Sequence, residues 1–195
     1  MPQHEPSADL SGKRIIVGVT GGVAIYKSCE LVRWLVRSDA IVNVCMTDAA
    51  QKLVQPVLFE ALSRNFCMTD SFPRIGDSPS APYPHISPAE TCDLFIIAPL
   101  TANTMAKLAT GSADNLLTTL ALALPQRAVR TGCPAMNPAM WRAAPTQRNL
   151  STLKADGWRI VEPDEGEVAC GHIGAGRLAD LSLIQADIIQ SLTGV

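Results

Sequence analysis

The chain has 195 residues, of which 47% are hydrophobic and 17% charged, and its formal net charge is −2. This length supports one domain with a full hydrophobic core. The charge gives no basic field, so we expect no nucleic-acid partner. No apolar run approaches the ~20 residues that a membrane-spanning helix needs, so we expect no membrane association either.

The first twelve residues, MPQHEPSADLSG, lack the basic and apolar regions of a signal peptide. They predict a disordered tail that precedes a single domain over residues 13–195. The six cysteines are scattered without a CxxC pair, which favours neither a zinc site nor a redox dithiol, so no metal is expected. Cys29, Cys45 and Cys92 lie in apolar segments and are predicted to be buried thiols. A reducing, cytoplasmic setting suits such cysteines.

Short β-branched runs alternate with amphipathic segments in the first half of the chain. Predicted strands lie at residues 13–20 and 40–47, and predicted helices at 23–38, 48–54 and 55–64. Thr47 or Asp48 is the expected N-cap of the second helix, because short oxygen-bearing side chains favour that position. A stretch rich in Pro, Ser, Asp and Gly follows at residues 70–84 and predicts a loop.

The same alternation continues in the second half. Predicted strands lie at residues 92–99, 127–132 and 158–163, and predicted helices at 101–110, 113–124, the later part of 142–157 and 181–192. Gly111 is expected to stop the first of these helices. Residues 164–180, DEGEVACGHIGAGRLAD, predict a glycine-rich loop.

Strands that alternate with helices predict a parallel sheet covered on both faces, a doubly wound α/β domain. Ligands of such domains bind outside the carboxyl ends of the strands. The segments TGG, MTDAA, PLTANT and PAMNPAM each follow a predicted strand, so all four are expected at that edge.

The first of these segments is a strand–Gly-Gly–helix turn, VTGGVAIYK. Glycines let the backbone approach an anionic ligand, and the N–H groups of a helix N-terminus favour phosphate. The segment is neither a GxGxxG fingerprint nor a P-loop. A plain tight turn explains it equally well.

The segment PLTANT places Thr101, Asn103 and Thr104 directly after the strongest strand. Three small hydrogen-bonding side chains at a helix start could bind a phosphate or the edge of a flavin ring. The alternative is ordinary N-capping by Thr101, which stabilises a helix by about 1 kcal/mol.

The stretch CPAMNPAMW, residues 133–141, is apolar apart from one amide, Asn137. Pro134 and Pro138 lack a backbone donor, so the stretch is predicted to be neither a regular helix nor a central strand. An unpartnered buried amide costs about 1–3 kcal/mol. Asn137 could therefore cap the next helix or supply the polar contact of an apolar ligand pocket.

Two further side chains are candidates for chemistry. His85 ends the proline-rich loop beside the strand at 92–99 and could be catalytic or simply exposed. Cys170 is flanked by small residues in the glycine-rich loop, where an accessible, reactive thiol would lie. An incidental loop cysteine is the alternative.

Four segments in this order resemble the homo-oligomeric flavin-containing cysteine decarboxylases: GVTGGVAIYK, PLTANTMAKLATGSADNLLTT, PAMNPAMW and ACGHIGAGRLAD. The resemblance extends from Lys13 to about Leu192 and is nearest to the phosphopantothenoylcysteine decarboxylases of that family. It implies a flavodoxin-like, Rossmann-like three-layer domain. It also implies FMN at a subunit interface, in homotrimers or in a homododecamer of trimers.

The resemblance also implies a role for each matching residue. His85 would be the catalytic base and Cys170 the proton donor. Asn137 would hold the substrate carboxylate, with Met140 and Ala169 as further substrate contacts. The implied FMN contacts are Gly21, Gly22, Val23, Thr47, Asp48, Ala49, Thr101, Ala102, Asn103, Thr104 and Ala135.

The implied reaction is the decarboxylation of a cysteine moiety, most simply phosphopantothenoylcysteine to phosphopantetheine in coenzyme A biosynthesis. FMN accepts a hydride equivalent so that carbon dioxide can leave, and the protein positions the substrate. Cys170 favours this reductive enzyme. One alternative is oxidative decarboxylation of a peptide C-terminal cysteine, which suits a stand-alone chain with Glu167 before ACG. The other is a flavin-binding regulatory subunit without catalysis.

Overall fold

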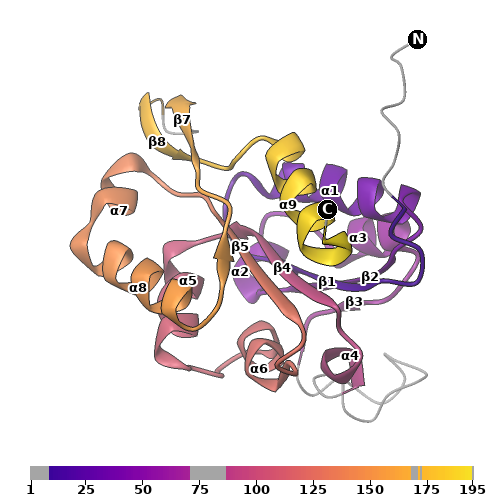
Figure 1. The fold of residues 1–195 in the computed structure, drawn as a ribbon. Helices are drawn as coiled ribbons and strands as arrows, with labels where there is room; N and C mark the ends of the chain where they lie inside the picture. The colour runs from indigo at the N-terminus through magenta and orange to yellow at the C-terminus, as the bar shows by residue number, and fades with distance from the viewer. Residues whose placement is uncertain (1–8, 71–86, 168–170, 172, 195) are drawn as a thin grey trace.

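A parallel six-stranded sheet forms the centre of the protein. The structure is a computed structural model that describes residues 9–70, 87–167, 171 and 173–194. Its strand order is β3-β2-β1-β4-β5-β6, and all five pairings are parallel (Figure 1). The strands are β1 (Arg14–Val19), β2 (Ile41–Met46), β3 (Cys67–Met68), β4 (Leu94–Leu100), β5 (Val129–Pro134) and β6 (Arg159–Ile160).

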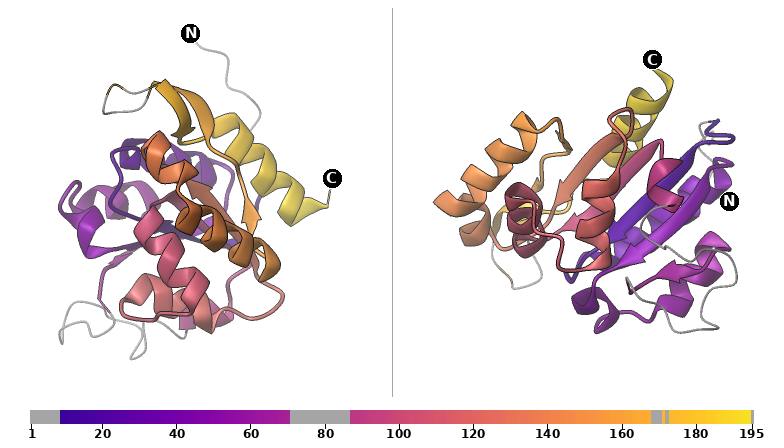
Figure 2. Two further views of the ribbon diagram at one scale, coloured as in Figure 1. Left: turned by 90° about the vertical axis from the view of Figure 1, so that its left-hand side faces the viewer. Right: turned by 90° about the horizontal axis from the view of Figure 1, so that it is seen from below.

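Helices cover both faces of this sheet, as Figure 2 shows from two sides. One face carries α1 (Ile25–Arg37), α3 (Pro56–Ser63) and α9 (Leu181–Thr193). The other carries α4 (Ser87–Glu90), α5 (Ala102–Thr110), α6 (Leu116–Ala123) and α8 (Ala144–Ala155). A separate apolar core lies on each face, with Phe59 in the first and Phe95 in the second. The doubly wound α/β fold predicted from the sequence is therefore confirmed.

The order of elements follows the predicted alternation, because each apolar run is bounded by a cap or a breaker. The short helix α2 (Asp48–Gln51) begins at Thr47, whose hydroxyl accepts from the backbone N–H of Ala50. The helix α5 ends at Gly111, in the left-handed conformation that favours glycine. Strand β4 is buried along its whole length, as a central parallel strand must be.

The prediction for the stretch 133–141 was wrong in part. Cys133 and Pro134 are the last residues of β5, a strand with neighbours on both sides, and Pro134 pairs with Leu100. Proline is tolerated there because the strand ends at that residue. Pro138 then begins α7 (Pro138–Arg142), where its missing N–H costs no helical hydrogen bond.

The glycine-rich loop predicted at 164–180 contains a second, two-stranded sheet. Strands β7 (Asp164–Glu167) and β8 (Ile173–Arg177) are antiparallel and stand beside α7 (Figure 1). Alternation could not reveal them, because the segment has few apolar side chains.

Two smaller expectations also differ from the structure. Leu10, assigned to the tail, is fully buried, and its N–H donates to the carbonyl of Ser38. Cys29 is only half-buried, whereas Cys45 and Cys92 are buried as predicted. Within the described ranges, no helix combines the length and the apolar character needed to cross a membrane.

Candidate functional site

The candidate site lies at the carboxyl edge of the sheet, where β2, β1, β4 and β5 are consecutive neighbours. Three of the predicted segments meet there through glycines. A Cβ atom added to Gly21 would lie 2.5 Å from the Cβ of Ala49. One added to Gly22 would lie 3.4 Å from Pro99 and 3.6 Å from Thr101. The turn after β1 therefore touches the turns after β2 and β4, and only glycine fits at position 21.

The glycine turn leads into α1, whose N-terminus differs from those of three other helices. No side chain caps α1 and its first turn has no acidic residue. By contrast, Thr101, Asn115 and Asp180 cap α5, α6 and α9. The N–H groups of Gly22, Ile25 and Lys27 already donate to backbone carbonyls, so an anionic group such as a phosphate would be met by the other N–H groups of the turn. The residues present therefore fit the phosphate end of a flavin nucleotide.

Capping accounts for part of the PLTANT segment. The hydroxyl of Thr101 accepts from the N–H of Thr104 at 3.4 Å, and the two hydroxyls lie 3.2 Å apart. Thr104 is buried, Ala102 is half-buried and Asn103 is exposed. The capping interpretation is thus confirmed, and the exposed side chain of Asn103 leaves ligand binding a prediction.

Asn137 also caps a helix. Its side-chain oxygen Oδ1 accepts from the N–H of Ala139 at 2.8 Å, at the start of α7. That bond fixes which end of the amide is the acceptor and which is the donor. Of its neighbours, Met136 is half-buried, Pro138 buried and Met140 49% exposed. Ala135, also half-buried, donates its N–H to the carbonyl of Leu100 and so ties this turn to β4.

The β7–β8 hairpin rests on the same turn through its backbone. The N–H of Met136 donates to the carbonyl of Gly176 at 2.9 Å. A Cβ atom on Gly176 would lie 2.3 Å from the carbonyl oxygen of Met136, and one on Gly174 would lie 3.1 Å from Pro138. These two glycines let the hairpin dock, and their spacing, IGAG, is the signal that could have indicated a close approach.

Some predicted residues lie outside the described part of the chain. His85, Ala169 and Cys170 are among them, so their proposed roles rest on the sequence. In the chain, residues 169 and 170 connect β7 with β8. The described cysteines are not candidates for chemistry: burial raises the pKa of Cys92 to about 11 and that of Cys67 to about 12. No group of three or more His, Cys, Asp or Glu among the described residues could hold a metal.

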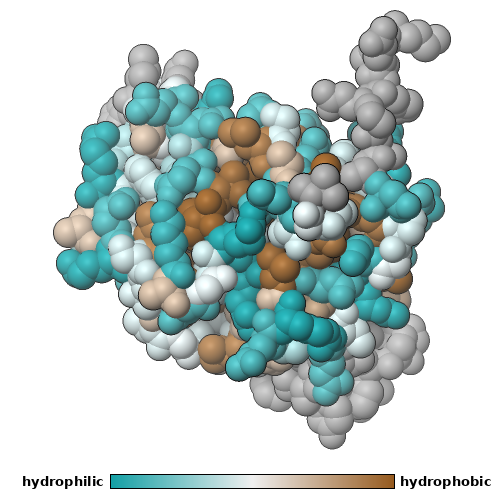
Figure 3. Space-filling model, viewed as in Figure 1, coloured by the Kyte–Doolittle hydropathy of each residue, from teal (hydrophilic) through white to brown (hydrophobic). Residues whose placement is uncertain are grey.

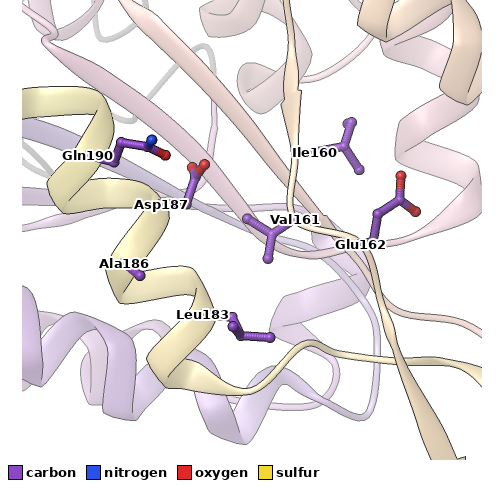
Figure 4. A pocket seen from close by; sticks show the side chains of 7 residues that line it. All are labelled: Ile160, Val161, Glu162, Leu183, Ala186, Asp187 and Gln190. Carbon is purple, nitrogen blue, oxygen red and sulfur yellow. The ribbon is translucent and has the colours of Figure 1, made fainter. Parts of the chain in front are cut away.

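A second concave region lies away from this edge, between β6 and α9. On the face seen in Figure 1, apolar residues surface between polar ones (Figure 3), and a cavity of about 590 Å³ opens there (Figure 4). The cavity is lined by Ile160, Val161, Glu162, Leu183, Ala186, Asp187 and Gln190. Arg159 binds the carboxylate of Asp187 at 2.6 Å and Thr131 donates to it at 3.2 Å, so this acid is already paired. We therefore assign the functional site to the glycine-rich edge.

The fold and this edge define the class: a doubly wound α/β protein, of the kind that binds its ligands outside the carboxyl ends of its strands. A family model described as Flavoprotein matches residues 3–193. The chain belongs to this flavin-binding family.

Curated relatives agree with this assignment. The chain is 39% identical over 180 residues to a probable phosphopantothenoylcysteine decarboxylase of Streptococcus mutans, covering 92% of this chain and 99% of that protein. It is 43% identical over 171 residues to the coenzyme A biosynthesis bifunctional protein CoaBC of Bacillus subtilis. That alignment covers 88% of this chain and 41% of the bifunctional protein, so the chain spans well under half of it.

Solved structures show the same fold. The FMN-dependent cysteine decarboxylase SpaF superposes with a TM-score of 0.78 at 32% identity, covering 93% of this chain and 98% of SpaF. A variant of a PPC decarboxylase complexed with pantothenoylaminoethenethiol gives a TM-score of 0.79 at 28% identity, covering 90% and 96%. The flavodoxin-like architecture implied by the sequence is confirmed by these likenesses.

Proposed function

We propose that the protein is an FMN-dependent decarboxylase that converts phosphopantothenoylcysteine to phosphopantetheine in coenzyme A biosynthesis. The probable phosphopantothenoylcysteine decarboxylase that it resembles at 39% identity is covered almost completely. The CoaBC proteins, named for coenzyme A biosynthesis, support the same pathway. The non-catalytic regulatory subunit is disfavoured, because enzymes account for these relatives.

The observation that carries the proposal is the meeting of the glycine turn with two other ligand segments at one sheet edge. A Cβ atom added to Gly21 would meet Ala49, and one added to Gly22 would meet Thr101. The neighbouring strand β5 brings Asn137 to the same edge. A long, flat cofactor with a phosphate at one end suits such a row of short side chains and open N–H groups.

In this proposal each segment at the sheet edge contacts one part of FMN. Gly21, Gly22 and Val23 face the FMN phosphate, and the other implied FMN contacts follow along the edge: Thr47, Asp48, Ala49, Thr101, Ala102, Asn103, Thr104 and Ala135. Bound FMN would supply the two-electron redox chemistry that lets the cysteine moiety lose carbon dioxide.

The protein groups would bind the substrate and move its protons. Asn137 would hold the substrate carboxylate, as the resemblance implies, while its side-chain oxygen accepts from the N–H of Ala139. Met140 and Ala169 would be further substrate contacts, as the resemblance implies. His85 takes a proton from the substrate, and Cys170 returns one to the product.

The first test uses phosphopantothenoylcysteine as the substrate. Purified protein supplied with FMN should release carbon dioxide from phosphopantothenoylcysteine and form phosphopantetheine. A Cys170→Ser variant should still consume substrate but release less of the reduced product. A wild-type protein that binds no FMN, or binds it without releasing carbon dioxide, would refute the proposal.

A second candidate is oxidative decarboxylation of a peptide C-terminal cysteine. The likeness to the FMN-dependent cysteine decarboxylase SpaF, which is matched over nearly all of its length, favours it. Mass spectrometry of a cysteine-ended peptide would show a loss of about 46 Da, one carbon dioxide and two hydrogens, if this activity is present. The faster of the two substrates identifies the function.

We also propose that the active form is a homo-oligomer, either a trimer or a dodecamer built of trimers, with FMN at the subunit interface. Val23 and Met140 are exposed apolar side chains at the site, 63% and 49% accessible in the single chain. Apolar surface of this kind favours cover by another subunit. Light scattering of the FMN-loaded protein measures the assembly, and a monomeric, active protein would contradict it.

A further inference from the structure

Two fully buried hydroxyls lie directly beneath the candidate flavin site. Thr20, the residue before the glycine turn, donates its hydroxyl to the carbonyl of Pro99 at 2.6 Å. Ser28, on α1, donates to the carbonyl of Ala98 at 2.6 Å. These residues are 79 and 70 positions apart in sequence from the carbonyls they bind. The two bonds therefore join the first strand and helix to the end of β4.

The sheet itself explains why these carbonyls need side-chain donors. The pairing of β1 with β4 ends at Gly18 and Ile97, and the register between β4 and β5 shifts between Ile97 and Leu100. Ala98 and Pro99 fall in this interruption, and a proline has no N–H of its own. A buried carbonyl without a donor costs about 1–3 kcal/mol, so the two hydroxyls stabilise an irregular strand end.

Thr20 also holds the neighbouring turn. Its hydroxyl oxygen accepts from the N–H of Thr101 at 3.1 Å while its hydrogen goes to Pro99. Its own carbonyl accepts from the N–H of Gly22 at 2.8 Å. Thr20 thus bonds to the glycine turn through its backbone and to the PLTANT segment through its side chain.

The glycine turn and the PLTANT segment are close neighbours. A Cβ atom added to Gly22 would lie in ordinary contact with Pro99 and Thr101, at 3.4 and 3.6 Å. If the PLTANT segment moved by a fraction of an ångström, the space between it and the glycine turn, which a bound nucleotide would occupy, would change in width. A hydroxyl that sets this spacing acts on the ligand without touching it.

We propose that Thr20 is a positioning residue for the flavin: its buried hydroxyl sets the separation of the glycine turn and the PLTANT segment, and Ser28 supports the same strand end. The inference rests on the proposed flavin function. It assigns to Thr20 an effect on flavin affinity that an equally buried threonine away from the site does not have.

The chain offers a matched control, Thr131. Thr131 lies in β5 and, like Thr20, is fully buried. Its hydroxyl donates to Asp187 at 3.2 Å, away from the site. Thr20→Val and Thr131→Val each keep the shape of the side chain and remove one buried hydroxyl. Thr20→Ser restores the hydroxyl at the site and serves as the rescue variant.

The experiment uses the FMN-loaded protein. Each variant is diluted, and the release of FMN is followed through the recovery of free flavin fluorescence, beside urea unfolding of the same sample. Thr20→Val should weaken FMN affinity about tenfold, the equivalent of one buried hydrogen bond. Thr131→Val should lower the free energy of unfolding about as much as Thr20→Val does, but it should leave FMN affinity unchanged. Thr20→Ser should bind FMN as the wild type does.

Several outcomes would overturn the inference. Unchanged FMN affinity in Thr20→Val refutes it, and so does an equal loss in Thr131→Val. If Thr20→Val does not fold, Thr20→Ala replaces it with the same expected loss of affinity. A wild-type protein that binds no FMN refutes the proposed function itself, which separates that failure from a failure of the positioning role.

Discussion

The cavity between β6 and α9 and the glycine-rich edge of the sheet differ in how their polar groups are used. Between β6 and α9 the cavity is large, yet Asp187 is paired with Arg159 and Thr131. At the carboxyl edge of β1, β2 and β4 there are glycines, short side chains and an uncapped helix start. Polar groups left open to a ligand therefore indicate the site better than hollow volume does.

The largest effect is expected at the glycine-rich edge, from Asn137→Asp. The new carboxylate still accepts from the N–H of Ala139, so α7 and FMN binding should remain. It cannot donate to the substrate carboxylate and repels it, so turnover should fall by at least about a hundredfold. Steady-state rates of FMN-loaded protein measure this, with Asn149→Asp on α8 as the control. Near-normal turnover would remove Asn137 from the site.

The next largest effect should come from Gly21→Ala. The added Cβ would lie 2.5 Å from the Cβ of Ala49, which is closer than two side-chain carbons approach each other. The turns after β1 and β2 must therefore separate. We expect FMN affinity to fall by more than about tenfold. Gly22→Ala makes only ordinary contacts and should lose much less. The ratio of flavin to protein absorbance after gel filtration compares the two, and equal losses would show that close approach is not the cause.

The apolar core that contains Cys92, on the face covered by α4, α5, α6 and α8, should limit stability at high pH. Burial raises the pKa of Cys92 from 9.0 to about 11, so its stabilising contribution is complete below pH 9 and is lost as the pH rises toward 11. At pH 10.5 this thiol alone should lower the free energy of unfolding by about 2 kcal/mol. Urea unfolding at pH 8 and 10.5 should show a smaller decrease in Cys92→Ala. Parallel decreases in the two proteins would contradict this.

The smallest effect is expected in the cavity between β6 and α9. Asp187→Asn removes the charge that Arg159 and Thr131 share, and it should cost about 1 kcal/mol of stability. Turnover should not change, because this acid lies away from the site. Glu162→Gln, which breaks an exposed pair with Lys154, should cost less than about 0.5 kcal/mol. A loss of turnover in Asp187→Asn would reverse the comparison between the two regions.

Local signals explain why the sequence predicted most of the fold. Buried strands and amphipathic helices show in nearby residues, and so do stops such as Gly111 and caps such as Thr47. The candidate site segments were likewise chosen on local signals, because each follows a strand, and their role stays a prediction. The capping bonds of Thr101 and Asn137 were anticipated as alternatives to ligand binding, and the structure shows both.

What the sequence did not reveal depends on residues far apart in the chain. The bond from Thr20 to Pro99 spans 79 positions, and its need arises only from an irregular strand end. The β7–β8 hairpin likewise docks through the contact of Gly176 with Met136, two residues that are far apart in the chain. Pro134 could join β5 because its position at the strand end removes the usual penalty. None of these follows from periodicity.

The docking of the β7–β8 hairpin has a consequence for how such proteins diversify. Its hold on the Asn137 turn comes from the backbone of Gly176 and from the close approach of Gly174 to Pro138. Side chains elsewhere on the hairpin, such as Glu165 and Ala175, are therefore free to vary without disturbing that contact. Selection could exchange them to admit a new acyl or peptide portion of the substrate while the flavin edge of the sheet stays unaltered.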